Sequence, residues 1–334
     1  MGFTKNFRTP VQLTGVARAA FDALIGQYLT DDLLPVNRTY DINFSFGIAE
    51  GALPPAASFR SFNTAADVGT TTDSETKSGK LPPLSRRIPV DEYQQLTMFN
   101  ASADQVGQKF EDYAARIAQS FALRFVLAQA EAVQSGKVTI NERNLSFTVD
   151  FGRRANLTGT AATVWSNTVD SDPLADLQGL RNAYKRRVGR IVVSRTVMGY
   201  LQSNETIIKL ALGRGTDLPP LISEDAVRSV IRSFGLGELV VNEEVLINAS
   251  GVEVPLFASD KVILLPSAGP IGRTDLGVTA ESIRTDTGIA QTERAGLFAG
   301  ALESDNPSGY DVLVSGIGLP ILTDPNNTAV LDVA

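Results

Sequence analysis

The side chains that most often carry out chemistry near neutral pH are missing from this chain, which has 334 residues, no histidine and no cysteine. Histidine is the usual general base, triad member and metal ligand. Cysteine supplies thiolates, disulfides and sulfur ligands for metals. Their absence excludes most familiar catalytic constellations, so any chemistry would have to rest on carboxylates and basic side chains.

Acidic residues stand in three arrangements that could do chemistry. The tripeptide Asp-Thr-Gly at 286–288 matches the core of an aspartic-protease motif, in which two such carboxylates share a proton. It occurs once, and Arg-Thr rather than a buried strand precedes it, so the pattern indicates a turn. The pairs Asp31-Asp32 and Glu243-Glu244 could surround Mg²⁺, but adjacent residues do not share a face of a helix or strand. We expect both pairs on the solvated surface.

Two other segments carry glycine or basic residues. Gly-Arg-Gly at 213–215 lacks the Gly-Lys-Ser/Thr ending of a phosphate-binding loop and follows helical sequence, which favours a mobile surface loop. Lys-Arg-Arg at 185–187 is the strongest basic run, and at a helix C-terminus it complements the helix dipole. The net charge of −7 argues against a nucleic-acid-binding surface. The sequence thus indicates no catalytic, cofactor-binding or metal-ligating residue and no cofactor.

The composition, 43% hydrophobic and 20% charged, is typical of a globular chain long enough for two domains. No run approaches the ~18 apolar residues that a membrane span needs. The N-terminal sequence MGFTKNFRTP has no apolar region of a secretory signal. We expect a soluble protein that is made in a cytoplasm and has no membrane partner.

The elements that would position any site are organised around one long helix, predicted from Ser102 to Gly136. Ser102 and Gln105 match a capping box, and Gly136 suits the position after the last turn. A helix of this length spans about 48 Å and would cross the whole subunit. It is either a generic core helix or the central element of a specialised fold. Its apolar stripe comprises Val106, Phe110, Tyr113, Ile117, Phe121, Phe125 and Ala128.

The segments before this helix cannot form a core of their own. Residues 16–25 predict a short amphipathic helix in an N-terminal arm that packs on its own subunit or on a neighbour. Residues 41–48 alternate as a strand, and a breaker-rich segment follows to residue 87. This exceeds the usual loop limit of ~12–15 residues. It is either an extended hairpin that lies on another surface, such as another subunit, or a disordered loop.

The segments after the long helix alternate between strands and helices, which indicates a compact α/β or α+β subdomain from about 174 to 290. Asp172-Pro173 begins a helix that we expect to end at Gly189. The other expected elements are a hairpin over 137–140 and 145–151, strands at 190–194, 238–242 and 261–265, and helices at 196–212 and 223–234.

The order of these parts, together with short local sequences, resembles a known family over roughly residues 100–334. The local sequences are Gly-Lys-Val-Thr at 136–139, Val-Asp-Phe-Gly-Arg at 149–153, Trp165-Ser166, Asp172-Pro173 with Asp176, Leu-Gly-Arg-Gly at 212–215, Glu-Arg-Ala-Gly at 293–296 and Leu-Pro-Ile-Leu-Thr-Asp-Pro at 319–325. The family is that of the lambda-type major capsid proteins of tailed bacteriophages, with the Hong Kong 97-type fold. The acidic stretch 302–306 departs from its pattern.

The resemblance implies an α+β Hong Kong 97-like fold with a long spine helix, an extended loop, a P domain and an A domain. The expected domains are an N-terminal arm (1–40), an extended loop or E-loop (41–90), a peripheral P domain (91–173, with the spine helix 102–136), an axial A domain (174–290), and C-terminal strands returning to the P domain (291–334). Relatives that crosslink use a Lys and an Asn. Lys77 and Lys80 lie in the loop region, but nothing identifies a partner Asn or a catalytic carboxylate, so no crosslink is predicted.

The implied function is structural rather than enzymatic. The chain would self-assemble into hexamers and pentamers of an icosahedral shell that encloses double-stranded DNA without sequence-specific binding. Scaffold, maturation protease and portal proteins would be partners, as would a cement or decoration protein. The protein would be made and assembled in the host bacterial cytoplasm and reside in the virion capsid. The alternatives are an encapsulin-like nanocompartment, a carboxylate-based enzyme such as a glycosidase, and a tail or baseplate protein.

Overall fold

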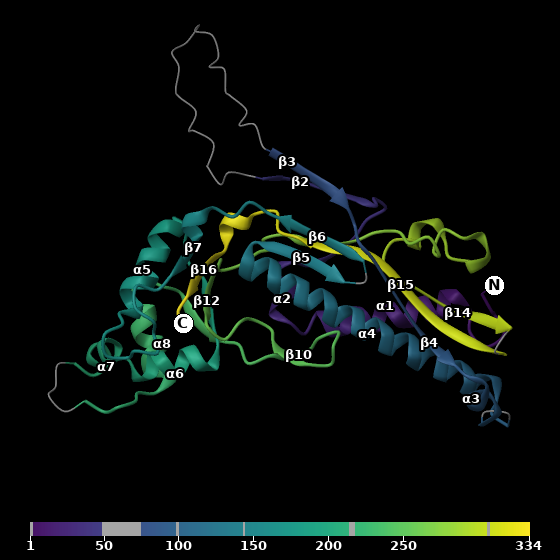
Figure 1. Cartoon of the computed structure of the whole chain (residues 1–334), viewed down its shortest axis with the longest axis horizontal. Helices are drawn as coiled ribbons and strands as arrows, with labels where there is room; N and C mark the ends of the chain where they lie inside the picture. The colour runs from purple at the N-terminus through teal and green to yellow at the C-terminus, as the bar shows by residue number, and fades with distance from the viewer. Residues whose placement is uncertain (1–2, 49–74, 98–99, 143, 214–217, 306–307) are drawn as a thin grey trace, which may run out of the picture.

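Two hydrophobic cores organise the subunit, one along the long helix α4 and one among the helices α5 to α8 (Figure 1). The computed structural model describes residues 3–48, 75–97, 100–142, 144–213, 218–305 and 308–334. Helices and strands are mixed throughout both parts. The 3-10 helices are η1 (Ala155–Leu157), η2 (Thr285–Thr287), η3 (Gln291–Glu293) and η4 (Pro325–Asn327).

The long helix predicted from the sequence is confirmed as α4 (Ala103–Ser135). Ser102 accepts a hydrogen bond from the backbone N–H of Gln105, and the Gln105 side chain accepts one from the backbone N–H of Ser102. Gly136 ends the helix in the left-handed conformation with φ 70°, which only glycine adopts freely. The predicted apolar stripe is buried except for Tyr113, which is half-buried.

The N-terminal arm packs on its own subunit, which resolves the choice that the sequence left open. α1 (Pro10–Ile25) begins at Pro10 rather than at residue 16, because Thr9 and Gln12 form a capping box and proline suits the first turn. The Phe21 ring of α1 lies 5.8 Å from the Phe125 ring of α4 in an edge-to-face arrangement. α2 (Leu29–Leu33) follows and also contacts α4.

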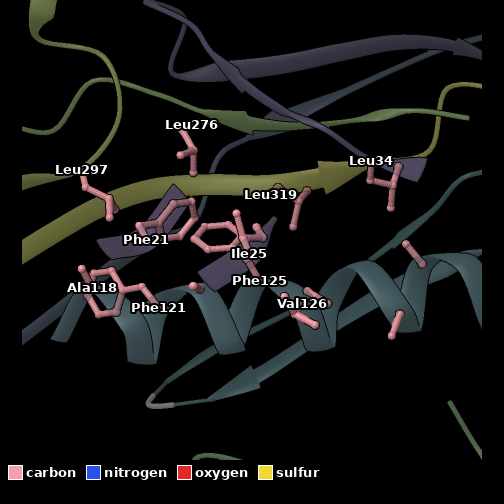
Figure 2. Packing of buried hydrophobic residues seen from close by; sticks show 14 of the residues in the cluster. Phe21, Ile25, Leu34, Ala118, Phe121, Phe125, Val126, Leu276, Leu297 and Leu319 are labelled. Carbon is pink, nitrogen blue, oxygen red and sulfur yellow. The ribbon is translucent and has the colours of Figure 1, made fainter. Parts of the chain in front are cut away.

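A β-sheet covers α4 and completes the first core. Its strands run in the order β1–β13–β15–β14, and β4 also pairs with β15. Figure 2 shows β15 above α4, with Leu276, Leu297 and Leu319 reaching into the space that Phe121 and Phe125 fill. The strands of this sheet are β1 (Val36–Arg38), β4 (Pro83–Val90), β13 (Arg273–Leu276), β14 (Phe298–Asp305) and β15 (Ser308–Ile321).

Two hairpins lie beside this sheet, and both contain strands expected from the sequence. β2 (Asn43–Ile48) pairs antiparallel with β3 (Glu75–Lys80), and β5 (Lys137–Glu142) pairs antiparallel with β6 (Leu145–Asp150). The β2–β3 hairpin extends away from the body (Figure 1). Most of the expected extended loop, 49–74, lies outside the described residues. The same expected range includes β4, which lies in the sheet beside β15. The short helix α3 (Glu92–Thr97) follows β4.

The second core lies between helices and a sheet ordered β7–β16–β12–β8–β9. The helix predicted over 196–212 is two helices, because Asn204 caps the second one and its Oδ1 accepts from the Ile207 N–H at 3.1 Å. The elements are β7 (Thr158–Thr160), α5 (Pro173–Tyr184), β8 (Arg190–Val193), α6 (Arg195–Ser203), α7 (Glu205–Leu212), α8 (Glu224–Ser233), β9 (Glu238–Val241), β12 (Lys261–Leu265) and β16 (Ala329–Asp332).

Helix α5 begins after Asp172 as predicted but ends at Tyr184 rather than at Gly189. Lys185 adopts a left-handed conformation with φ 55°, and its N–H donates to the Arg181 carbonyl, which ends the helix. Gly189 has a different role, because a Cβ there would lie 2.0 Å from the Ser267 Cα. Only glycine allows these two backbone segments to approach this closely.

The C-terminal segment serves both sheets. β14 and β15 lie in the first sheet, but β16 pairs with β12 and β7 in the second. The end of the chain therefore contributes strands to both sheets. A small hairpin of β10 (Val245–Ile247) and β11 (Glu253–Pro255) lies near α4.

Candidate assembly surfaces

The β2–β3 hairpin is fixed to the body by aromatic packing at its base. Phe44 and Phe46 of β2 are buried, and the Phe46 ring lies 5.3 Å from the Phe151 ring after β6. A Cβ at Gly79 would lie 2.6 Å from the Phe44 ring, so this position of β3 accepts only glycine without movement. The described part of the hairpin is therefore anchored on its own subunit, and β2 and β3 set the direction in which it leaves the body.

One of the two loop lysines takes part in this anchor. Lys77 Nζ donates to the Asp150 carbonyl oxygen at 3.1 Å. The Asp150 side chain pairs with Lys137 Nζ at 3.0 Å and accepts from the Gly152 N–H at 2.9 Å. Lys80 lies exposed at the end of β3. The contact of Lys77 is thus a structural one that joins β3 to β6.

The N-terminal segment is held to α4 by charged contacts. The Arg8 guanidinium pairs with Glu111 at 2.5 Å and with Asp104 at 3.1 Å. The hydrogen bonds to Glu111 and Asp104 are the main cause that raises the pKa of Arg8, and the charges of the two carboxylates add to it. Further along the arm, Arg18 Nε donates to the Leu297 carbonyl at 2.8 Å. The arm is consequently part of the folded subunit.

Among the exposed apolar side chains of the described residues, those at three places stand out as surfaces from which a monomer would gain nothing. The first is α3, with Tyr93 and Leu96. The second is the groove beside the start of β2, with Tyr40 and Ile42. The third is the β10–β11 hairpin, with Val245, Ile247 and Val252. Such surfaces suit contacts with other proteins.

The motifs that could have done chemistry are surface features. Asp286 lies in η2 and pairs with Arg284 at 2.6 Å, which confirms a turn. That hydrogen bond lowers the pKa of Asp286. Glu243 pairs with Arg195 on the surface. Residues 214–217 of the glycine-containing loop lie outside the described residues.

Within the two acidic pairs, Asp31 and Glu244 are half-buried rather than fully solvated, unlike the expectation from the sequence. The Oδ1 of Asp31 is also a buried atom without a hydrogen-bond partner. Burial, followed by the charges of Asp32 and Asp22, raises the pKa of Asp31. Across the described ranges, no group of three or more acidic side chains could hold a metal ion. No helix in the part of the chain that the structure describes could span a membrane.

Two polar side chains that the sequence did not single out, the buried Gln129 and the half-buried Arg153, hold the first core together. Gln129 of α4 donates from Nε2 to the Leu34 carbonyl at 3.0 Å and to Thr274 Oγ1 at 2.8 Å. Its Oε1 accepts from Thr30 Oγ1 at 2.9 Å. The second is Arg153, whose guanidinium lies on the last carbonyls of α4. A glutamine within an apolar helical stripe was the available signal for the first.

Comparisons with known protein families and solved structures show what the whole chain is similar to. A family profile described as phage major capsid protein E matches residues 44–333. No curated protein sequence matches the chain significantly.

Solved structures resemble the chain in fold at low sequence identity. A structure described as a prophage capsid protein from Escherichia coli CFT073 is 13% identical, with 98% of this chain and 99% of that chain covered and a TM-score of 0.65. A phage-related protein from Bordetella bronchiseptica RB50 is 14% identical, with 96% of each chain covered and a TM-score of 0.52. The capsid of the myovirus XM1 is 13% identical over 92% of each chain, with a TM-score of 0.48.

The long central helix, the two cores and the likeness to the prophage capsid structure give this chain the Hong Kong 97-type fold. Because the profile matches most of its length, the chain belongs to the phage major capsid protein E family. This confirms the resemblance to the lambda-type major capsid proteins, the expected α+β fold and the phage capsid function. The protein is a structural component of the virion that assembles into shell oligomers.

Proposed function

We propose that copies of this chain form hexamers and pentamers of an icosahedral shell that encloses double-stranded DNA. The family match over 44–333 carries this proposal. The exposed apolar surfaces support it, because a subunit that stayed monomeric would gain nothing from them. The chain acts as a building unit rather than as an enzyme.

The proposed division of the subunit follows its two cores. The core along α4 corresponds to the peripheral domain, and the core among α5 to α8 corresponds to the axial domain. The β2–β3 hairpin, which is anchored on Phe151 and extends away from the body (Figure 1), is the base of the extended loop.

The proposed partners follow from the same function. Scaffold, maturation protease and portal proteins act during assembly in the host cytoplasm, and a cement or decoration protein binds the finished shell. The net charge of −7 suits an inner face that contains packaged DNA without binding it tightly.

Electron microscopy of the purified, expressed chain tests the proposal. Closed icosahedral particles are expected, whereas tubes, flat rings or a small oligomer would contradict it. Particles recovered from the phage-producing host are expected to contain double-stranded DNA. Protein cargo without DNA would instead support an encapsulin-like nanocompartment.

A further inference from the structure

An apolar groove of about 590 Å³ lies at the start of β2, and we call it the Tyr40 groove. Tyr40, Ile42 and Ile283 line it and are each more than half exposed, at 56%, 56% and 54%. Ile317 of β15 and Arg294 also line it. Its volume lies in the range of ~300–1,000 Å³ typical of sites that receive a ligand or a group of side chains.

The walls of the groove are fixed before anything binds. Tyr40 Oη donates to the Gln291 carbonyl at 3.0 Å, which joins the segment before β2 to η3. The Gly277 N–H donates to the Ile317 carbonyl at 2.8 Å, and the Gly296 N–H donates to the Gly277 carbonyl at 3.0 Å. A preformed groove requires little ordering on binding.

Arg294 gives the groove an uncompensated positive charge. It forms no ion pair or hydrogen bond with any residue that the structure describes, and its Nε is buried without a partner. The neighbouring arginines differ, because Arg38 pairs with Asp22 at 2.6 Å and Arg18 donates to main-chain carbonyls. The groove therefore suits an occupant that presents apolar side chains together with a carboxylate.

The helix α3 presents such a surface, and we call Glu92, Tyr93 and Leu96 the α3 face. Tyr93 is 74% exposed and Leu96 67% exposed, and α3 buries none of its residues. Leu96 follows Tyr93 by three residues and Glu92 by four, so its side chain lies between theirs on one side of the helix. Glu92 makes no described hydrogen bond or ion pair, whereas Asp91 accepts from the Gln94 N–H at 2.8 Å.

The α3 face and the Tyr40 groove of one subunit cannot meet. α3 lies beside the N-terminal end of α4, at one end of the molecule, and the start of β2 lies away from it (Figure 1). Tyr40 and Ile42, which line the groove, directly precede β2. Strand β15 joins the two regions, since its Ile317 lines the groove and α3 contacts the same strand. A second copy, which a shell-forming protein always has beside it, supplies the α3 face.

We propose that the Tyr40 groove receives the α3 face of a second copy of this chain, with Glu92 of that copy placed against Arg294. The contact is heterologous, because one copy contributes its Tyr40 groove and the other its α3 face. Each copy therefore still has one of the two surfaces free for a further copy, and the contact repeats. This inference rests on the proposed function, in which copies form a shell. The β10–β11 hairpin, where Ile247 and Glu253 are opposite each other, is the competing occupant.

Crosslinking tests which surfaces meet, and the absence of cysteine gives a clean background. The variant carrying Ile283→Cys and Leu96→Cys is assembled and treated with a short bis-maleimide. This reagent spans more distance than a disulfide, which needs Cα atoms closer than ~7 Å. A ladder of covalent multimers on a denaturing gel is expected. The control carrying Ile283→Cys and Ile247→Cys is expected to stay monomeric. No ladder in assembled particles, or an equal ladder in the control, overturns the proposal.

Charge reversal tests the polar part of the contact. Arg294→Glu and Glu92→Arg are each expected to lower the yield of particles about tenfold. The double variant is expected to restore it, whereas Arg294→Glu combined with Glu253→Arg is not. Thermal unfolding of each monomer confirms that it folds. A double variant no better than the worse single variant overturns the proposal. If the wild-type chain forms no particles at all, the proposed function fails instead.

Discussion

Arg153 Nη1 donates a hydrogen bond to the Gln134 carbonyl at 3.0 Å, in the last turn of α4. The same guanidinium also donates to the Ala132 and Val133 carbonyls. Carbonyls at a helix C-terminus have no partner within the helix and carry the negative end of its dipole. Burial lowers the pKa of Arg153 to about 10, which still leaves it charged at neutral pH. The residue thus closes the central helix and fixes the chain that follows β6.

We predict that Arg153→Met lowers the free energy of unfolding by about 2–3 kcal/mol, because charged hydrogen bonds to part-buried carbonyls at the helix end are lost while the side chain keeps its length. Denaturant unfolding of the monomer measures this. Arg116→Met is the control, since Arg116 is exposed on the same helix and forms no described bond. Equal shifts in the two variants would show that the cap contributes nothing.

Gln129→Leu is predicted to destabilise the monomer by a similar ~2–3 kcal/mol. The change leaves the Thr30 hydroxyl and the Thr274 hydroxyl with fewer partners inside the core, and each buried polar group without a bond costs about 1–3 kcal/mol. The melting temperature provides the measurement. Gln108→Leu, on the exposed side of α4, is the matched control and is expected to have little effect. A gain in stability from Gln129→Leu would refute this account.

Local signals predicted the parts of the fold whose causes are local. The boundaries of α4 follow from Ser102, Gln105 and Gly136, which lie next to the turns that they cap. Thr9 and Gln12 form a capping box that also marks the start of α1. The predicted start at residue 16 is wrong because it follows the stronger apolar run that begins there. Cap residues thus fix helix ends more accurately than the apolar pattern.

Contacts between distant segments could not be predicted in this way. Gly189 fits a helix end, but its place is set by Ser267, far along the chain. Arg153 donates to backbone carbonyls of α4. Every residue has a backbone carbonyl, so the sequence does not indicate which ones a side chain will bind. The same holds for the assembly surfaces, since the exposure of Tyr93 depends on what the rest of the fold leaves uncovered.

Phe46→Ala is predicted to loosen the β2–β3 hairpin without unfolding the body. The ring contact with Phe151 is lost, and an aromatic pair contributes about 0.5–1.5 kcal/mol beyond its buried area. Amide hydrogens of β2 and β3 should exchange about tenfold faster, as a change of ~1.4 kcal/mol implies, while those of α4 stay protected. Phe234→Ala, which removes an exposed ring after α8, is the control. Unchanged exchange in β2 would contradict the anchor.

Removing residues 50–80 is predicted to leave a folded monomer that forms no shells. Neither core includes a described residue of this range, so stability should change little. Residues 49–74 lie outside the described residues, and 75–80 form β3, so a second deletion of 50–73 that keeps β3 separates the two contributions. Sedimentation and electron microscopy provide the measurement. Intact shells from the longer deletion would contradict the role of this segment.

Asp31→Asn is predicted to stabilise the monomer at neutral pH. Burial raises the pKa of Asp31 above the usual value of 3.8, so the folded state holds its proton more tightly than the unfolded state. The folded state is therefore favoured by protonation below pH 3.8, and this advantage is lost as the pH rises through the folded pKa. At neutral pH the half-buried carboxylate is charged and destabilises the folded state, and asparagine removes this charge.

The gain from Asp31→Asn is expected to be about 0.5 kcal/mol, because water screens a side chain that is only half-buried. This gain should vanish below about pH 3.8, where Asp31 is protonated in both the folded and the unfolded protein. Thermal unfolding between pH 3 and pH 7 measures the difference from the wild type. Asp112→Asn, on the exposed side of α4, is the control for the substitution itself. A gain from Asp31→Asn that stayed constant over this range would mean that its cause is packing or the unpaired Oδ1 rather than ionisation.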